Sequence, residues 1–248
     1  MADVQPNIDP PLPVPCDPLL RGQMARLAVA ALSVGAAVPV IAWGLVGPAP
    51  AAIGLAMAGH LAGAVLALAL LRRGYPHDDL GLCNLVTLMR LALSAALLAP
   101  LVAPAASWAV LGVAIAALAL DGVDGWLARR EGRVSAFGAR LDVEVDAALS
   151  LILALNALAS GTVGIGVLLL GLPRYAYMAA ALALPWMARP LPERFDRKLI
   201  CVVQIAVLIA LQAPFVDGLL AGALVAGTAL ALAWSFGRDV LWLWRARS

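Results

Sequence analysis

Four aspartates stand close together in the sequence, at spacings that place them on helix faces. Asp121 and Asp124 are three residues apart, and Asp142 and Asp146 are four residues apart. Residues three or four apart share one face of an α-helix, so each pair predicts a carboxylate-bearing face. A carboxylate inside a bilayer costs at least a few kcal/mol, so it indicates a functional site with a compensating partner.

The chemistry that such carboxylates suit is the binding of divalent metal ions. Clustered carboxylates repel one another, and near lipid they stay ionised only when a cation neutralises them. Oxygen ligands without His or Cys favour Mg²⁺, Mn²⁺ or Ca²⁺. Three or four carboxylates also suit two metals about 3.5 to 4 Å apart, an arrangement for displacement at phosphorus. We therefore expect a diphosphate substrate. The alternative, a solvated hairpin tip, leaves the depth of the acids unexplained.

The composition predicts an all-α integral membrane protein. Hydrophobic residues make up 63% of the 248 residues and charged residues only 13%, against about 25% charged in soluble domains. A transmembrane helix needs about 20 apolar residues. Runs of about this length predict eight transmembrane helices, the seventh being the shortest, at about 27–47, 51–71, 82–103, 106–128, 138–160, 163–187, 198–213 and 216–237.

The placement of positive charge predicts the orientation in the membrane. Of the 17 Lys and Arg residues, all except Arg90 and Arg174 fall on one side if the eight helices alternate. By the positive-inside rule, both termini and the Asp-rich connection face the cytoplasm. We expect a bacterial-type inner (plasma) membrane, with membrane lipids as surroundings and no nucleic acid as partner.

Four segments are expected along the chain. They are a disordered Pro-rich tail over 1–20, an N-terminal transmembrane helix pair over 21–74, a six-helix catalytic core over 82–237, and a basic interfacial tail over 238–248. The first segment has six prolines and no basic residue, unlike the charged start of a signal peptide. The three cysteines lack any metal-ligand spacing.

The predicted topology puts the two acidic pairs at one level. Asp121 lies about 12 Å from the inner end of its descending helix, and Asp146 lies about 12 Å along the next, rising helix. If the two helices pack face to face, Asp121 opposes Asp146 and Asp124 opposes Asp142.

Small and basic residues beside the acids suit a diphosphate. Gly125 and Gly138 permit a close approach by a ligand or a neighbouring helix, Ala128 keeps the same face small, and Arg129 offers a forked donor that matches phosphate. The alternative is that the glycines serve only helix packing and the arginines only the positive-inside rule.

The pattern D-x2-D-G-x2-A-R-x8-G-x3-D-x3-D, from Asp121 to Asp146, resembles the signature of the CDP-alcohol phosphotransferase (CDP-alcohol phosphatidyltransferase) family. The resemblance implies a six-helix core, here preceded by two extra helices. It implies a reaction of phospholipid biosynthesis, in which an alcohol hydroxyl attacks the β-phosphate of a CDP-linked lipid donor, usually CDP-diacylglycerol, and CMP leaves. It also suggests a homodimer.

Roles for single residues follow from the same resemblance. Asp121, Asp124 and Asp142 would bind the metals, two Mg²⁺ or Mn²⁺ ions, and Asp146 would lie near a metal and act as general base. The residues lining the CDP pocket would be Gly125, Ala128, Arg129 and Gly138.

The stretch NLVTLMR is similar to the N-x-x-T-x-x-R start of the family's first core helix, which adds Asn84, Thr87 and Arg90 to the expected donor site. Arg90 reaches the depth of the acids, where it can pair with a carboxylate or a donor phosphate. For Asn84 and Thr87 the alternative is capping of the helix start.

Four further cations form the predicted acceptor site. Arg174 lies near mid-membrane, where an Arg must face protein or a water-filled cavity, and Pro173 can kink its helix. Arg194, Arg197 and Lys198 follow in a connection. Together they would suit a phosphorylated alcohol. For the three connection residues, membrane topology alone is the alternative.

Two rival functions use similar residues. A membrane prenyltransferase also binds Mg²⁺-diphosphate with aspartates, but two separated Asp-rich motifs are expected there and this chain has one. A divalent-cation transporter would carry acids at several depths along a path, whereas here they are predicted at one level.

Overall fold

The computed structural model describes residues 18–77, 79–188 and 194–245, which form α-helices and short connections without β-strands. The predicted disordered tail lies mostly outside these residues. The α-helices are α1 (Pro18–Gly35), α2 (Ala37–Val46), α3 (Pro50–Leu71), α4 (Gly81–Ala96), α5 (Ser107–Arg130), α6 (Ala136–Ala159), α7 (Leu168–Gly171), α8 (Pro173–Ala183), α9 (Phe195–Ala210) and α10 (Gly218–Arg245). Three 3₁₀ turns join them, η1 (Ala99–Leu101), η2 (Ile165–Val167) and η3 (Pro185–Ala188).

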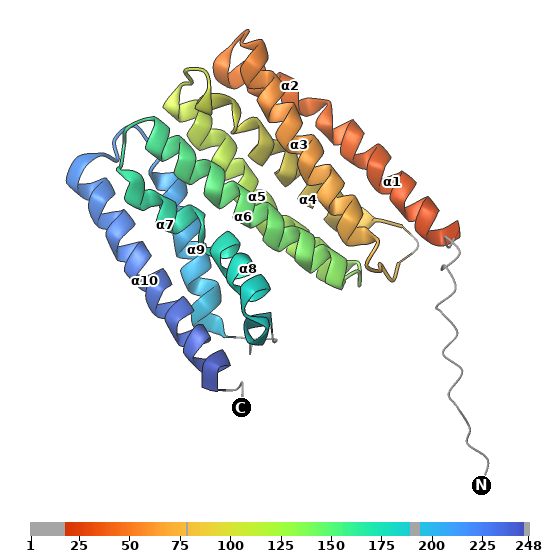
Figure 1. The fold of residues 1–248 in the computed structure, drawn as a ribbon. Helices are drawn as coiled ribbons and strands as arrows, with labels where there is room; N and C mark the ends of the chain where they lie inside the picture. The colour runs from red at the N-terminus through yellow and green to blue at the C-terminus, as the bar shows by residue number, and fades with distance from the viewer. Residues whose placement is uncertain (1–17, 78, 189–193, 246–248) are drawn as a thin grey trace.

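The long helices lie side by side and run back and forth across the bundle (Figure 1). Helices α1 to α3 occupy one edge, and α10 occupies the opposite edge. The start of α1 and the end of α10 lie at the same end of the bundle.

Five stretches of helix are long and apolar enough to cross a membrane, namely Leu19–Val46, Pro50–Leu71, Gly81–Leu101, Ser107–Arg130 and Gly218–Arg245. A sixth is added if the bent pair of α7 and α8 is one span. The predicted all-α membrane fold is therefore confirmed for the described residues. Eight transmembrane helices were predicted, and the two that are missing from these six are α6 and α9. Helix α9, with 16 residues, is short for a transmembrane span, and α6 carries three acidic residues in its first half, Asp142, Glu144 and Asp146.

Two predicted helices differ in outline. The run over 163–187 is broken, with Ile165–Gly171 and Pro173–Ala183 bent by 66° relative to each other. Proline has no N–H for the helical hydrogen bond, so the break at Pro173 follows from the sequence. Helix α10 runs to Arg245, past the predicted end of the last helix at 237, so residues 238–245 of the predicted interfacial segment are helical.

Close packing fixes α6 and the N-terminal helices around α4. On α7, a Cβ at Gly171 would lie 2.8 Å from the Cβ of Ala154 and 3.1 Å from the Cα of Leu151, so α7 touches the backbone of α6. On α3, Gly63 faces the side chain of Leu91 on α4. Buried residues of α1, α3, α4 and α6 form one apolar cluster, which packs the N-terminal helices against α4, which carries Arg90, and against α6, which carries Asp142 and Asp146.

Candidate active site

Arg90 of α4 is the shared partner of all four aspartates. Its Nη1 contacts Asp124 of α5, at 2.8 Å, and Asp142 of α6. Its Nη2 contacts Asp121 of α5, at 2.7 Å, and Asp146 of α6. Each terminal guanidinium nitrogen thus contacts one acid of α5 and one acid of α6. The two pairs are those predicted from the sequence to face each other, Asp124 with Asp142 and Asp121 with Asp146. The side chain is only 1% exposed, so a buried Arg is compensated by carboxylates, as its depth requires.

The four carboxylates differ in access. The Asp124 side chain is 8% exposed, while those of Asp121, Asp142 and Asp146 are 38%, 39% and 32% exposed. Asp124 also accepts a hydrogen bond of 2.9 Å from the Thr87 hydroxyl. Arg90 and Thr87 therefore hold Asp124 in the interior, and the other three acids face an accessible space.

The three accessible acids fit a divalent ion. Carboxylate oxygens of Asp121, Asp142 and Asp146 lie within 4.8 Å of one another, and ligands on opposite sides of an octahedral Mg²⁺ are about 4.2 Å apart. The ion pairs join Arg90 to one oxygen of each of these acids, and a carboxylate has a second oxygen that can act as a metal ligand. Four carboxylates share a single guanidinium, and a divalent cation would compensate negative charge that the guanidinium does not.

Gly125 and Arg129 follow the acids on α5. A Cβ at Gly125 would lie 3.5 Å from Nη1 of Arg129, so the Arg129 side chain folds back along its own helix across this glycine. The absence of a side chain at Gly125 thus leaves the space that the guanidinium occupies. Ala128 is half-buried on the same helix.

The start of α6 brings Gly138 to Asn84. Ser135 caps the helix and accepts a hydrogen bond of 3.1 Å from the N–H of Gly138. A Cβ at Gly138 would lie 3.4 Å from Oδ1 of Asn84. The capping alternative for Asn84 and Thr87 is wrong, because neither side chain accepts a hydrogen bond from the N–H groups at the helix start. Asn84 donates to the Leu80 carbonyl, and the single hydroxyl proton of Thr87 is shared between the Cys83 carbonyl and Asp124.

Two of the four predicted acceptor cations pair with acidic residues of neighbouring helices. Arg174 of α8 pairs with Glu144 of α6, and Arg197 of α9 contacts the buried Asp239 of α10 at 3.3 Å. Arg194 precedes α9 as a half-buried residue, and Lys198 is exposed on its first turn. Glu144 and Asp239 were not predicted from the sequence as partners of these cations, although Glu144 lies between Asp142 and Asp146.

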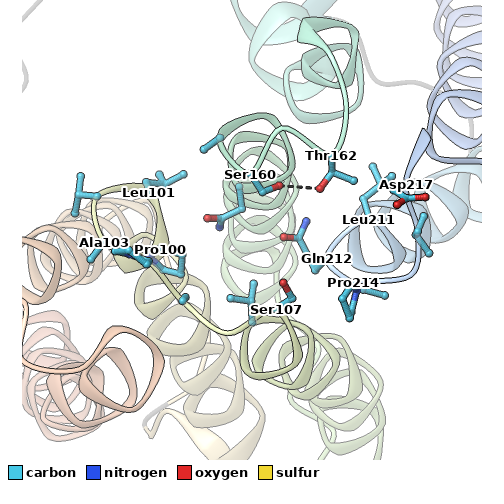
Figure 2. A pocket seen from close by; sticks show the side chains of 18 residues that line it. Pro100, Leu101, Ala103, Ser107, Ser160, Thr162, Leu211, Gln212, Pro214 and Asp217 are labelled. Atoms are coloured by element: carbon cyan, nitrogen blue, oxygen red, sulfur yellow. Dashed lines mark hydrogen bonds between the residues drawn. The ribbon is translucent and has the colours of Figure 1, made fainter. Parts of the chain in front are cut away.

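The cavity drawn in Figure 2 lies elsewhere, where α5 begins and α6 ends. It measures about 510 Å³, and its lining includes Ser107, Ser160, Thr162, Gln212 and Asp217. Ser107 begins α5, about 21 Å along the helix from Asp121. The lining contains no Lys or Arg that would bind a phosphate. The aspartates are therefore a better candidate site than this cavity.

Within the described residues, the fold is thus an all-helical membrane bundle with a carboxylate site suited to a divalent ion. Residues 80–237 match the profile of the CDP-alcohol phosphatidyltransferase family. This is well over half of the chain, so the protein belongs to that family. No significant match was found among curated proteins or among solved structures. The family is one of transferases that move a phosphatidyl group from a CDP-alcohol.

Proposed function

We propose that this protein transfers a phosphatidyl group from CDP-diacylglycerol to an alcohol and releases CMP, as a step of phospholipid biosynthesis. The observation that carries the proposal is the convergence of Asp121, Asp142 and Asp146 within 4.8 Å, in a chain of the CDP-alcohol family. The metal ligands would be these three acids and Asp124.

Metal chemistry would supply the electrostatic part of catalysis. Bound Mg²⁺ or Mn²⁺ would act as a Lewis acid on the diphosphate and neutralise charge on the departing CMP. Arg129, whose guanidinium lies beside Gly125, would bind a phosphate of the donor through its forked guanidinium. Gly125, Ala128 and Gly138 leave room for the donor, and Asn84, Thr87 and Arg90 complete its site.

Asp146 would act as the general base for the acceptor alcohol. The acceptor hydroxyl oxygen forms a bond to the β-phosphorus, the bond from that phosphorus to the CMP oxygen breaks, and the hydroxyl proton passes to the Asp146 carboxylate. Asp146 lies one helical turn deeper in the membrane than Asp142, away from the cytoplasmic nucleotide end. Arg174, Arg194, Arg197 and Lys198 would bind a phosphate on the acceptor.

The test of the reaction uses the purified protein with CDP-diacylglycerol, Mg²⁺ or Mn²⁺, and a panel of alcohols with and without a phosphate. We expect CMP release and a new phospholipid identified by mass, both abolished by excess EDTA. A protein that moves Mg²⁺ across vesicles without CDP-lipid, and releases no CMP, would contradict the proposal in favour of transport.

The role of Asp146 is tested by Asp146→Asn, which keeps the volume but cannot take a proton. A lost general base lowers turnover by about 10² or more while CDP-lipid binding survives. The control is Asp217→Asn, at the opposite end of the bundle, which should leave turnover unchanged. If Asp146→Asn loses metal and donor affinity as severely as Asp121→Asn, then Asp146 is chiefly a ligand; turnover within a few fold of wild type refutes the base role.

A further inference from the structure

Tyr75 connects the N-terminal helices to the predicted nucleotide end of the site. It lies in the loop between α3 and α4, outside the residues that match the family. It is 8% exposed, and its hydroxyl lies 3.0 Å from the carbonyl oxygen of Leu80 and 3.1 Å from that of Asp79. The same hydroxyl accepts a hydrogen bond of 3.1 Å from Nδ2 of Asn84. Burial raises the pKa of Tyr75, so the hydroxyl keeps its proton at neutral pH.

These contacts fix the orientation of the Asn84 amide. Its Nδ2 donates to the Tyr75 hydroxyl and, at 2.5 Å, to the Leu80 carbonyl oxygen. The Leu80 carbonyl oxygen can only accept a hydrogen bond. The Tyr75 hydroxyl donates its own proton to a carbonyl, so towards Asn84 it also acts as an acceptor. Both oxygens therefore need a donor, which is the NH₂ group of the Asn84 amide and not its oxygen. The Oδ1 of Asn84 is therefore directed away from the loop and towards the start of α6 at Gly138.

The N-terminal helix pair holds Tyr75 in this position. Gln23 of α1 is 8% exposed and donates from Nε2 to the carbonyl oxygens of Tyr75, at 3.3 Å, and His77, at 2.7 Å. The Tyr75 ring also packs edge-on against Phe137, with 5.4 Å between ring centroids, one residue before Gly138. A chain of contacts thus runs from α1 through the loop to Asn84 and to the start of α6.

We propose that Tyr75 is a positioning residue for the CDP end of the site, which fixes the Asn84 side chain and is itself held by Gln23. This gives the two extra helices a part in donor binding. The inference rests on the proposed function, because it takes Asn84 and Gly138 as contacts of the nucleotide.

The direct test is Tyr75→Phe, which removes the hydroxyl and keeps the ring against Phe137. We expect the KM for CDP-diacylglycerol to rise about 5- to 10-fold, the scale of one lost hydrogen bond, with kcat within about 2-fold. The matched control is Tyr177→Phe, which loses a 2.8 Å hydrogen bond to the Met187 carbonyl oxygen on another part of the bundle. It should leave the donor KM unchanged.

A double-mutant cycle separates positioning from a general loss of structure. If Tyr75 acts through Asn84, then Tyr75→Phe has no further effect on the donor KM in an Asn84→Ala background, whereas independent roles give effects that add. Gln23→Met, as a second variant, should raise the donor KM in the same direction. An unchanged donor KM in Tyr75→Phe, or full additivity with Asn84→Ala, would overturn the inference and leave the proposed function intact.

If the wild-type protein releases no CMP, the proposed function is refuted. The inference about Tyr75 is then tested by measuring the equilibrium affinity of wild type and of Tyr75→Phe for CDP in the presence of Mg²⁺. Weaker binding by Tyr75→Phe supports it. Equal affinity, or no CDP binding by either protein, overturns it.

Discussion

Replacement of Arg90 by Met is the most informative perturbation of this protein. Met is unbranched and of similar length, but it leaves Asp121, Asp124, Asp142 and Asp146 without the guanidinium that contacts all four. Removing one partner of a buried ion pair typically destabilises a protein by about 3 to 5 kcal/mol, because the remaining charges stay uncompensated.

The magnitude here belongs at the lower end of that range. Three of the acids are between 32% and 39% exposed, so water screens their repulsion, and only Asp124, at 8%, is deeply buried. We expect a loss of about 3 kcal/mol without metal, equivalent to a thermal midpoint lower by roughly 6 to 12 °C for a protein of this length. Arg90→Lys should be intermediate, because one ammonium cannot replace two nitrogens that each serve a separate pair of acids.

The assay is thermal unfolding of the purified protein in detergent, in EDTA and at several Mg²⁺ concentrations. Mg²⁺ should raise the midpoint of Arg90→Met more than that of wild type, because an ion that binds only the folded state stabilises it and here replaces the lost positive charge. Arg238→Met is the control, since its partner Asp196 is 38% exposed and such pairs contribute about 0 to 1 kcal/mol. A midpoint for Arg90→Met that equals the control in EDTA would refute the reasoning.

Three further predictions follow from other contacts. Arg174→Ala should raise the acceptor KM more than the donor KM, since Glu144 holds that guanidinium beside α6; a raised donor KM with an unchanged acceptor KM would assign Arg174 to the donor site or the fold. Gly171→Ala should cost about 1 to 3 kcal/mol in unfolding measurements because its Cβ meets the α6 backbone, whereas Gly112→Ala, with open space around it, should be neutral or slightly stabilising. The hydrogen bond from Arg133 lowers the pKa of Asp79 in the folded protein. The stabilisation that this ion pair gives is therefore fully present above the pKa of Asp in the unfolded chain, about 3.9, and is lost as the pH falls through the lower pKa of the folded protein. The midpoints of wild type and Asp79→Asn should therefore differ at pH 6 and converge in strong acid; a constant difference would show that the ion pair is not its cause.

The sequence by itself determined the class of the protein and the position of its acids. Membrane hydropathy is a sum over consecutive residues, and the sharing of a face by Asp121 and Asp124 follows from 3.6 residues per helical turn. Both are local properties, so they required no knowledge of packing. The break at Pro173 is local as well, because it follows from the missing N–H of proline.

Only the tertiary structure decided which side chains meet across helices. Arg90 is 34 residues from Asp124 and 56 from Asp146, and no periodicity relates such positions. The pairing of Arg174 with Glu144, the inward placement of Asp124, and the contact of Tyr75 with Asn84 likewise depend on how α1, α3, α4, α5, α6 and α8 pack. The physical reason is that helix periodicity fixes the direction of a side chain only relative to its own helix, while its partner is set by the rotation and depth of the neighbouring helices.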